Sequence, residues 1–225
     1  MKIVVIGADQ GLGEKLCGII RQKGQQAAAG MYRIENAKNS GAEDGHLLLL
    51  TDVTDPDSLQ RAADVIRYSW GTADAVVDVA GVLTDGDRTH NLMDIDLQDV
   101  RTELEVNAIG VLSAFRAFYP VLNKNGRFVA VTSEGGSFSN KGDMFPSYGI
   151  SKTAANKIVQ ILRETVKDVE ILAVHPGRMN TEMGRTTAEI EPEEAAEGIY
   201  RIVAGETRLR EGLWFIDYKG CEMPL

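Results

Sequence analysis

A tyrosine and a lysine lie four residues apart in the segment Tyr148-Gly149-Ile150-Ser151-Lys152. On a helix, side chains with this spacing share one face, so the phenol and the ammonium would be neighbours. A free tyrosine has a pKa of about 10, which is too high for efficient proton exchange near neutral pH. We expect the ammonium of Lys152, together with the positive nicotinamide of an oxidised cofactor, to favour the phenolate and to lower the pKa of Tyr148. The pair predicts a proton donor and acceptor for a carbonyl or alcohol oxygen, although the spacing alone also suits a surface helix.

Two further polar residues, Ser133 and Asn107, could take part in the same chemistry. Ser133 follows the apolar run Arg127–Thr132, and a hydroxyl at the C-terminal end of a buried strand would face the ligand crevice and could hold a substrate oxygen. Asn107 lies in a largely apolar stretch, where a buried amide must find hydrogen-bond partners. A water that reaches Lys152 would be a useful partner, because it would form a proton route. An amide satisfied within the core is the alternative.

Three glycines, Gly7, Gly11 and Gly13, form a G-x-x-x-G-x-G motif directly after the apolar run Lys2–Ile6. Gly7 would allow a sharp turn, and the other two would let a pyrophosphate approach the backbone. The helix that follows would offer free N–H groups and a positive dipole end to the phosphates. The motif predicts a dinucleotide-binding loop, with a simple tight turn as the alternative. The other loop residues expected to contact the cofactor are Asp9, Gln10 and Leu12.

The end of the second apolar run, Gln26–Met31, bears on the choice between NAD and NADP. NAD-preferring sites place an aspartate or glutamate there to bind both ribose hydroxyls. The sequence reads Gly30-Met31-Tyr32-Arg33, without an acid, and Arg33 is placed to meet a 2′-phosphate. We therefore expect NADP(H) as the preferred cofactor, with NAD(H) possible, and Lys38 could assist Arg33.

Two later segments could complete the cofactor site. Asp52, followed by Val53, ends the third apolar run, and its carboxylate could accept from the adenine amino group or could serve the helix start at Pro56. The turn His175-Pro176-Gly177 could cover the nicotinamide, and a plain strand-exit turn is the alternative. Thr181 would bind the cofactor amide or the adjacent phosphate, and Met179 would contact the same region. His175 itself is expected to be structural.

Seven short apolar runs alternate with helical patterns and would position all these residues. The strands are predicted at Lys2–Ile6, Gln26–Met31, His46–Leu50, Ala75–Val79, Arg127–Thr132, Glu170–His175 and Leu213–Tyr218. The helices are predicted over residues 12–23, 57–69, 97–123, 148–167 and 192–204. Near-continuous apolar strands are typical of parallel sheets that are buried on both faces. The alternation predicts one α/β domain over residues 1–225, with a doubly wound parallel sheet of about seven strands in three layers.

In the helix predicted over residues 97–123, the segment Val106–Leu122 is apolar almost all the way round, and in the helix predicted over 148–167 apolar residues cover a broad face. A helix that is wet on one side should not show this pattern. Burial by neighbouring loops is one explanation. A homodimer or homotetramer that forms through these helices is the other.

Composition and charge exclude several classes of partner. The chain of 225 residues has a formal net charge of −9, which argues against nucleic acid and anionic membranes. No apolar run approaches the roughly 20 residues that span a bilayer, and no signal peptide is evident. Cys17 and Cys221 are expected to be free thiols, and their spacing from the three histidines suits no metal site. We expect a cytoplasmic protein without a bound metal.

In this order along the chain, the motifs resemble the short-chain dehydrogenase/reductase family. They are Gly7-x-x-x-Gly11-x-Gly13, Asp52, Ala80-Gly81, Asn107, Ser133, Tyr148-x-x-x-Lys152, and Pro176-Gly177 with Thr181. The resemblance implies a Rossmann-type fold in which Tyr148 is the acid/base and Lys152 holds the cofactor ribose and tunes Tyr148. It also implies that Ser133 orients the substrate, that Asn107 supports a proton relay, and that dimers or tetramers form through the two long helices.

The sequence departs from the family pattern in three places. The family's Asn-Asn-Ala-Gly reads Asp78-Val79-Ala80-Gly81, so the backbone contact of Ala80 and Gly81 near the adenosine ribose should survive without the asparagine side chains. The loop between Ser133 and Tyr148 is longer than usual, and Ser137 is the less favoured substitute for Ser133. The segment Met183–Ile190, which forms a substrate lid in relatives, is short and predicts an open site.

The motifs together predict an oxidoreductase that catalyses reversible NADP(H)-dependent hydride transfer between a carbonyl and an alcohol. The alternative is a non-catalytic dinucleotide sensor, which would need the glycine loop but not Tyr148 and Lys152. A related epimerase or dehydratase is a third option, and it usually carries a larger C-terminal substrate region than the short segment after residue 204.

Overall fold

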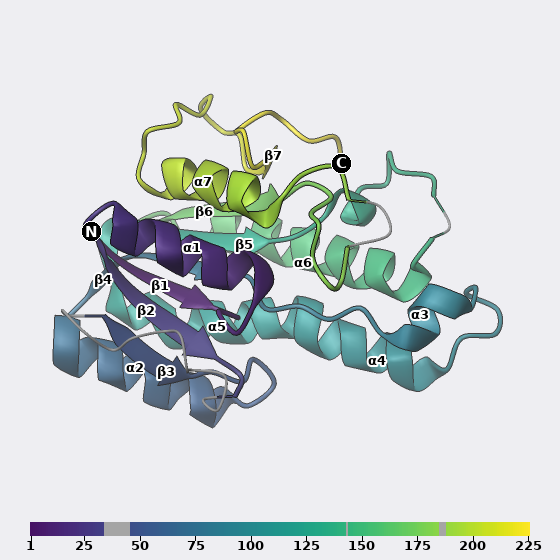
Figure 1. Cartoon of the computed structure of the whole chain (residues 1–225), viewed down its shortest axis with the longest axis horizontal. Coiled ribbons are helices and arrows are strands. Elements are labelled where there is room, and N and C mark those ends of the chain that lie inside the picture. Colours follow the sequence, from purple (N-terminus) through teal and green to yellow (C-terminus); the bar gives the residue numbers. More distant parts are fainter. Residues whose placement is uncertain (34–45, 143, 185–187) are drawn as a thin grey trace.

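The computed structural model describes residues 1–33, 46–142, 144–184 and 188–225 (Figure 1). Its centre is a sheet of seven strands in the order β3-β2-β1-β4-β5-β6-β7. Every neighbouring pair of strands is parallel, so the prediction of a doubly wound parallel sheet is confirmed. The strands are β1 (Lys2–Ile6), β2 (Gln26–Met31), β3 (Leu47–Leu50), β4 (Ala73–Asp78), β5 (Leu122–Val131), β6 (Glu170–His175) and β7 (Phe215–Asp217).

Helices cover both faces of this sheet. The α-helices are α1 (Gly11–Gln22), α2 (Pro56–Trp70), α3 (Asp85–Thr89), α4 (Leu97–Leu104), α5 (Gly110–Phe118), α6 (Pro146–Thr165) and α7 (Pro192–Val203). In Figure 1, α1 and α7 lie on one side of the sheet, and α2, α4, α5 and α6 lie on the other. Each face carries its own apolar core, and the residues of β1 alternate between the two cores. The expected three layers are therefore present.

The start of α2 shows how local sequence sets an element boundary. Asp55 is the N-cap residue, and its carboxylate accepts from the backbone N–H of Asp57 at 3.0 Å. Pro56 opens the helix, where its missing N–H costs nothing. Gly71, with φ of 78°, ends it. The predicted helix over 57–69 is thus confirmed within one residue at each end.

The prediction of a single helix over residues 97–123 is wrong. The segment contains α4, then a π-helical stretch at Glu105–Ile109, then α5 and a 3₁₀ turn at Tyr119–Val121. Pro120 lies in that turn, where a residue without an N–H cannot continue an α-helix. Leu122 already belongs to β5, which begins five residues before the predicted strand. Periodicity did not reveal these breaks, because the segment Val106–Leu122 is apolar almost all the way round.

The structure adds two short elements that the sequence analysis did not predict. They are α3 and a 3₁₀ turn at Glu134–Gly136, capped by the side chains of Thr84 and Ser133. Both lie in loops that leave the carboxyl ends of strands, and both position residues of the site described below. Among the described helices, none is sufficiently long and apolar to cross a membrane.

Candidate active site

The loops that follow β5 and β6 and the first turns of α6 line one cavity of about 810 Å³. Ligands bind at this carboxyl edge in open parallel sheets. The cavity walls include Ser133, Tyr148, Pro176, Gly177 and Thr181, which are residues predicted from the sequence. Residues far apart in the sequence therefore meet at one place.

The hydroxyls of Tyr148 and Ser133 lie together in this cavity. Tyr148 is in the first turn of α6, and Ser133 follows β5 as the cap of the 3₁₀ turn. The Ser133 oxygen accepts from the backbone N–H of Gly135 at 3.1 Å, which fixes its rotamer and leaves its own hydrogen available. Ser133 can donate a hydrogen bond to the Tyr148 oxygen. Ser137, the substitute considered for Ser133, is instead buried and accepts from the backbone of Ser139.

Lys152 lies one helical turn behind Tyr148 and is buried. Its ammonium donates to the backbone carbonyl of Val131 at 3.0 Å and lies 5.5 Å from the centre of the Tyr148 ring. Burial lowers the pKa of Lys152 to about 8, and the nearby carboxylate of Asp78 opposes this change. The lysine therefore remains mostly charged at neutral pH, close to the phenol that it is predicted to assist.

In the chain without the oxidised cofactor, the pKa of Tyr148 is raised rather than lowered. Desolvation raises the pKa of Tyr148 to about 12, the negative charge of Glu103 acts in the same direction, and the hydrogen bond with Ser133 acts against it. The sequence analysis counted the lysine but not the loss of water around the hydroxyl. Tyr148 is consequently a neutral phenol, the form that can donate a proton.

Asn107 lies in the π-helical stretch and is completely buried. Its amide nitrogen donates to the carbonyl of Val82 at 2.9 Å and to the hydroxyl of Ser151 at 3.0 Å. Its amide oxygen accepts from the N–H of Val82 at 2.8 Å. The side chain is thus satisfied by the protein, as in the alternative considered from the sequence, and it fixes the loop that contains Gly81. A role of Asn107 in a proton relay stays a prediction.

Asp87, on α3, holds the start of α6 and was not found from the sequence. Its two carboxylate oxygens accept from the backbone N–H groups of Ser147 and Tyr148, at 2.8 and 2.9 Å. Phe145, the residue that precedes the helix, has φ of 56° and provides no cap. Asp87 therefore supplies from a distant element the cap that α6 lacks. No local pattern connects residues 60 positions apart.

Two buried carboxyls surround the Tyr148–Lys152 pair. Asp78, which replaces an asparagine of the family motif, ends β4 and accepts from the N–H of Ala80 at 3.1 Å. Glu103, on α4, accepts from the N–H of Thr84 at 2.7 Å, while its second oxygen is buried without a partner. Burial raises the pKa of each carboxyl to about 7.

The glycine loop has the shape that a pyrophosphate requires. A Cβ on Gly7 would lie 2.7 Å from the backbone nitrogen of Ala80, and one on Gly13 would lie 2.2 Å from the carbonyl oxygen of Gly7. Gly11 has φ of 57° and lies against Thr181. The N-terminus of α1, at Gln10, has no side-chain cap, so its first-turn N–H groups suit an anion. These features fit a dinucleotide, which the backbone of this loop and of Ala80-Gly81 would hold.

The end of β2 carries no acid of its own, but an acid from the glycine loop lies against it. The carboxylate of Asp9 accepts from the N–H groups of Tyr32 and Arg33 at 2.9 and 3.1 Å. The sequence analysis considered only acids within the strand itself and so missed an acid that folds back onto its end. Arg33 is exposed, as a residue that meets a 2′-phosphate must be. Lys38 lies outside the described residues.

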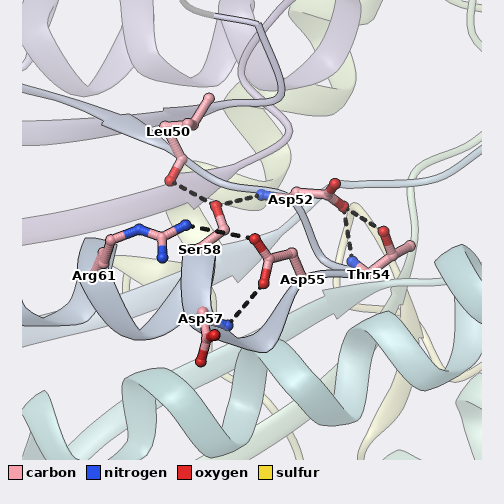
Figure 2. Close-up of polar contacts among 7 residues, drawn as sticks. All are labelled: Leu50, Asp52, Thr54, Asp55, Asp57, Ser58 and Arg61. Atoms are coloured by element: carbon pink, nitrogen blue, oxygen red, sulfur yellow. Dashed lines mark hydrogen bonds and ion pairs between the residues drawn. The ribbon is translucent and has the colours of Figure 1, made fainter.

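Figure 2 shows how Asp52 is held after the end of β3. One carboxylate oxygen of Asp52 accepts from both the N–H and the hydroxyl of Thr54, at 2.8 and 2.7 Å, whereas the helix cap is Asp55. The N–H of Asp52 donates to Ser58 at 3.2 Å (Figure 2). Val53 is buried, and its side chain would contact any Cβ placed on Gly110. A cofactor contact by Asp52 or Val53 stays a prediction.

The turn after β6 closes the cavity beside the glycine loop. His175 is buried, its ring nitrogen accepts from the N–H of Glu134 at 3.2 Å, and burial lowers its pKa. This is the structural role expected for it. Gly177, Met179 and Thr181 line the cavity, and Gly177 has φ of 84°. Of the predicted short lid Met183–Ile190, residues 185–187 lie outside the described part of the chain.

A glycine loop at the end of β1 and a Ser–Tyr–Lys cluster at the same edge of a parallel sheet are the parts of a dinucleotide-dependent oxidoreductase. The sequence pattern of the short chain dehydrogenase family matches residues 1–192. The chain belongs to this family.

Relatives and solved structures agree with this assignment. The chain is 30% identical over 212 residues to the 1-hydroxy-2-glutathionyl-2-methyl-3-butene dehydrogenase of Rhodococcus sp. strain AD45, with 89% of each chain covered. A short chain dehydrogenase of Burkholderia cenocepacia J2315 in complex with NADP is 25% identical with a TM-score of 0.81, covering 96% of this chain and 86% of that one. A short-chain dehydrogenase/reductase of Burkholderia multivorans with bound NADP shares the fold at a TM-score of 0.89 and 20% identity, covering 100% and 99%.

Proposed function

We propose that the protein catalyses reversible, NADP(H)-dependent hydride transfer between a carbonyl compound and an alcohol. The observation that carries the proposal is the neutral phenol of Tyr148 beside the Ser133 hydroxyl in a cavity, with the Lys152 ammonium behind it. A substrate oxygen that gains negative charge during hydride transfer is stabilised by a proton donor, a second hydrogen-bond donor and a nearby cation. Tyr148, Ser133 and Lys152 would supply these three groups.

In the direction of reduction, the substrate carbonyl oxygen accepts hydrogen bonds from Ser133 and Tyr148. The nicotinamide cofactor, when bound, supplies the hydride to the carbonyl carbon. The hydroxyl of Tyr148 then gives its proton to the substrate oxygen, and the ammonium of Lys152 stabilises the phenolate that remains. In the direction of oxidation, this phenolate accepts the proton of the alcohol.

Several features support NADP(H) as the cofactor. Arg33 is the second residue after the end of β2. It is exposed, so its guanidinium can pair with a 2′-phosphate. The two Burkholderia relatives bind NADP. NAD(H) is the possible second cofactor, because Asp9 places a carboxylate beside Arg33.

We further propose a homodimer or homotetramer that forms through α4, α5 and α6, the helices of residues 97–123 and 148–167. Ile109, in the π-helical stretch between α4 and α5, and Ile161, on α6, are exposed, which supports such an interface. Light scattering coupled to size-exclusion chromatography tests the assembly, and a monomer at all concentrations would contradict it. The unpaired Cys17 and Cys221 support a reducing compartment such as the cytoplasm.

The function is tested by following NADPH and NADH oxidation with a panel of aldehydes and ketones. We expect turnover with at least one carbonyl compound and formation of the matching alcohol. Tight cofactor binding in calorimetry, together with no turnover of any carbonyl or alcohol, would contradict the proposal and favour the non-catalytic sensor.

A further inference from the structure

Part of the wall of the active-site cavity is apolar, although the protein as a whole is acidic. Leucine, methionine, phenylalanine and isoleucine side chains form this part. These are Leu83, Leu92, Met93, Phe138, Met144, Phe145, Ile150, Met179 and Met183. Several are unusually exposed at the mouth, with Met93 at 93% and Phe138 at 83%. Apolar groups of this size are left in water mainly where they contact a ligand or partner.

The described wall offers no free charge to a substrate. Arg178 is the one lysine or arginine among the described lining residues, and it pairs with Glu134 at 2.6 Å and with Glu189 at 3.5 Å. Burial lowers the pKa of His175, so its ring is neutral. A substrate carboxylate or phosphate would therefore lose its hydration without a cation to replace it.

The polar side chains of the wall are turned to the protein's own backbone. Five of them bond a main-chain group within four residues, in a local turn or helical turn. They are Asn91 with Met93, Ser137 with Ser139, Asn140 with Gly142, Thr153 with Gly149, and Thr181 with Gly184. These bonds reduce the number of donors and acceptors that the wall could offer to a sugar or another polyol, which needs several of them.

From these observations we infer that the substrate is an uncharged, bulky, apolar carbonyl compound, such as an aryl ketone. Its carbonyl oxygen meets Tyr148 and Ser133, while its hydrocarbon part lies against Met93, Phe138 and Met144. The inference rests on the proposed function. Methionine side chains adapt to differently shaped apolar ligands, so related ketones of similar size should be accepted.

The test compares three substrates: 4-acetylbiphenyl, its 4′-carboxylate and dihydroxyacetone. We expect kcat/KM for 4-acetylbiphenyl to exceed the other two by at least about tenfold, as expected for burial of an apolar ring. A higher value for the carboxylate or for dihydroxyacetone would overturn the inference while leaving the proposed function intact. If none of the substrates in this set or in the wider carbonyl panel is reduced, the proposed function itself fails.

Exposed positions allow a variant test that does not threaten folding. Phe138→Ser should lower kcat/KM for 4-acetylbiphenyl roughly fivefold to tenfold, mainly through KM, and leave a small neutral aldehyde such as propanal unaffected. Tyr68→Ser is the matched control, because Tyr68 is 94% exposed on α2 and does not line the cavity. Equal losses in both variants, or none in Phe138→Ser, would overturn the inference.

A second, independent observation concerns the nucleotide. The N–H groups of Tyr32 and Arg33, which follow β2 and could donate to a 2′-phosphate, are both occupied by the Asp9 carboxylate. Asp9 also brings a negative charge to the place where Arg33 offers a positive one, so a phosphate there gains less from Arg33. We infer that Asp9 is a specificity-determining residue, which weakens NADP(H) binding and keeps NAD(H) usable.

Calorimetric titration of the purified protein with NADPH and NADH tests this inference without catalysis. Asp9→Asn removes the charge with little change of shape, and should tighten NADPH binding by roughly fivefold more than NADH binding. Glu14→Gln is the control, because Glu14 is an exposed acid of α1 that has no bond to the end of β2. An equal change for both nucleotides would overturn the role of Asp9. Failure of the wild-type protein to bind either nucleotide would contradict the proposed function as well.

Discussion

The carboxylate of Asp87 accepts a hydrogen bond of 2.9 Å from the backbone N–H of Tyr148, across 61 positions of sequence. The position of the Tyr148 phenol is therefore not set by α6 alone. It is also held by α3, whose Arg88 in addition donates to the carbonyl of Met183 in the cavity wall at 2.8 Å. A positioning residue such as Asp87 should affect catalysis through geometry rather than through contact with substrate.

Asp87→Asn should lower kcat by about tenfold to 100-fold, because the first turn of α6 loses one of its two acceptors and Tyr148 shifts. The free energy of unfolding should fall by about 1.5–3 kcal/mol, as for loss of a hydrogen bond to a charged group. Steady-state kinetics and urea denaturation measure the two effects. Asp85→Asn, on the exposed side of the same helix, should change neither. A normal kcat in Asp87→Asn would show that Tyr148 does not depend on this cap.

Asp78→Asn should shift the pH dependence of the reaction. The carboxylate of Asp78 raises the pKa of Lys152, which burial lowers to about 8. Without this anion, Lys152 should lose its proton at lower pH, so the alkaline limb of the kcat/KM profile for reduction should move down by roughly one pH unit. Asp74→Asn, at the other end of β4, should leave the limb in place. An unmoved limb, or one moved upward, in Asp78→Asn would contradict the electrostatic link.

Glu103 should make the protein less stable as the pH rises. Burial raises its pKa from 4.5 to about 7, so the folded state holds a proton that the unfolded state has released in this range. Stability from this group is complete below about pH 4.5 and is lost as the pH rises through about 7, by an amount of the order of 3 kcal/mol.

Glu103→Gln should therefore be more stable than the wild type at pH 8 and should show a flatter pH dependence. Denaturant unfolding at a series of pH values measures both. Glu105→Gln, two residues further and exposed, is the control. A variant that is less stable than the wild type at pH 8 would mean that the Glu103 carboxylate is needed in its charged form.

The glycine loop gives a matched pair of substitutions within one helix. Gly13→Ala would place a Cβ 2.2 Å from the carbonyl oxygen of Gly7, whereas Gly18→Ala places one in open space. Gly13→Ala should cost roughly 1–3 kcal/mol of stability and weaken cofactor binding, because the loop backbone must move. Gly18→Ala should stabilise α1 by up to about 1 kcal/mol without affecting binding. Thermal melts with and without NADPH measure both, and similar behaviour of the two variants would contradict the close packing of the loop.

The sequence predicted the seven strands because each is a short apolar run between turn residues, and parallel strands that are buried on both faces have no other signature. It predicted that Tyr148, Lys152 and Ser133 lie together, because their positions follow from local spacing and from the ends of strands, and their roles stay predictions. The helix over 97–123 was mispredicted because an apolar stretch conceals its own breaks. The contacts of Asp9 and Asp87 were not predicted from the sequence, because each carboxylate binds the backbone of a distant element. The raised pKa of Tyr148 in the chain without cofactor was not predicted, because desolvation depends on packing, which spacing does not describe.

The central claim is that Tyr148 gives its proton to the substrate oxygen, and the most direct measurement is single-turnover oxidation of NADPH by Tyr148→Phe. The account predicts that hydride transfer falls by at least about 100-fold while the Kd for NADPH stays within twofold of the wild type, because only the acid is lost. Hydride transfer at the wild-type rate in Tyr148→Phe would contradict the account.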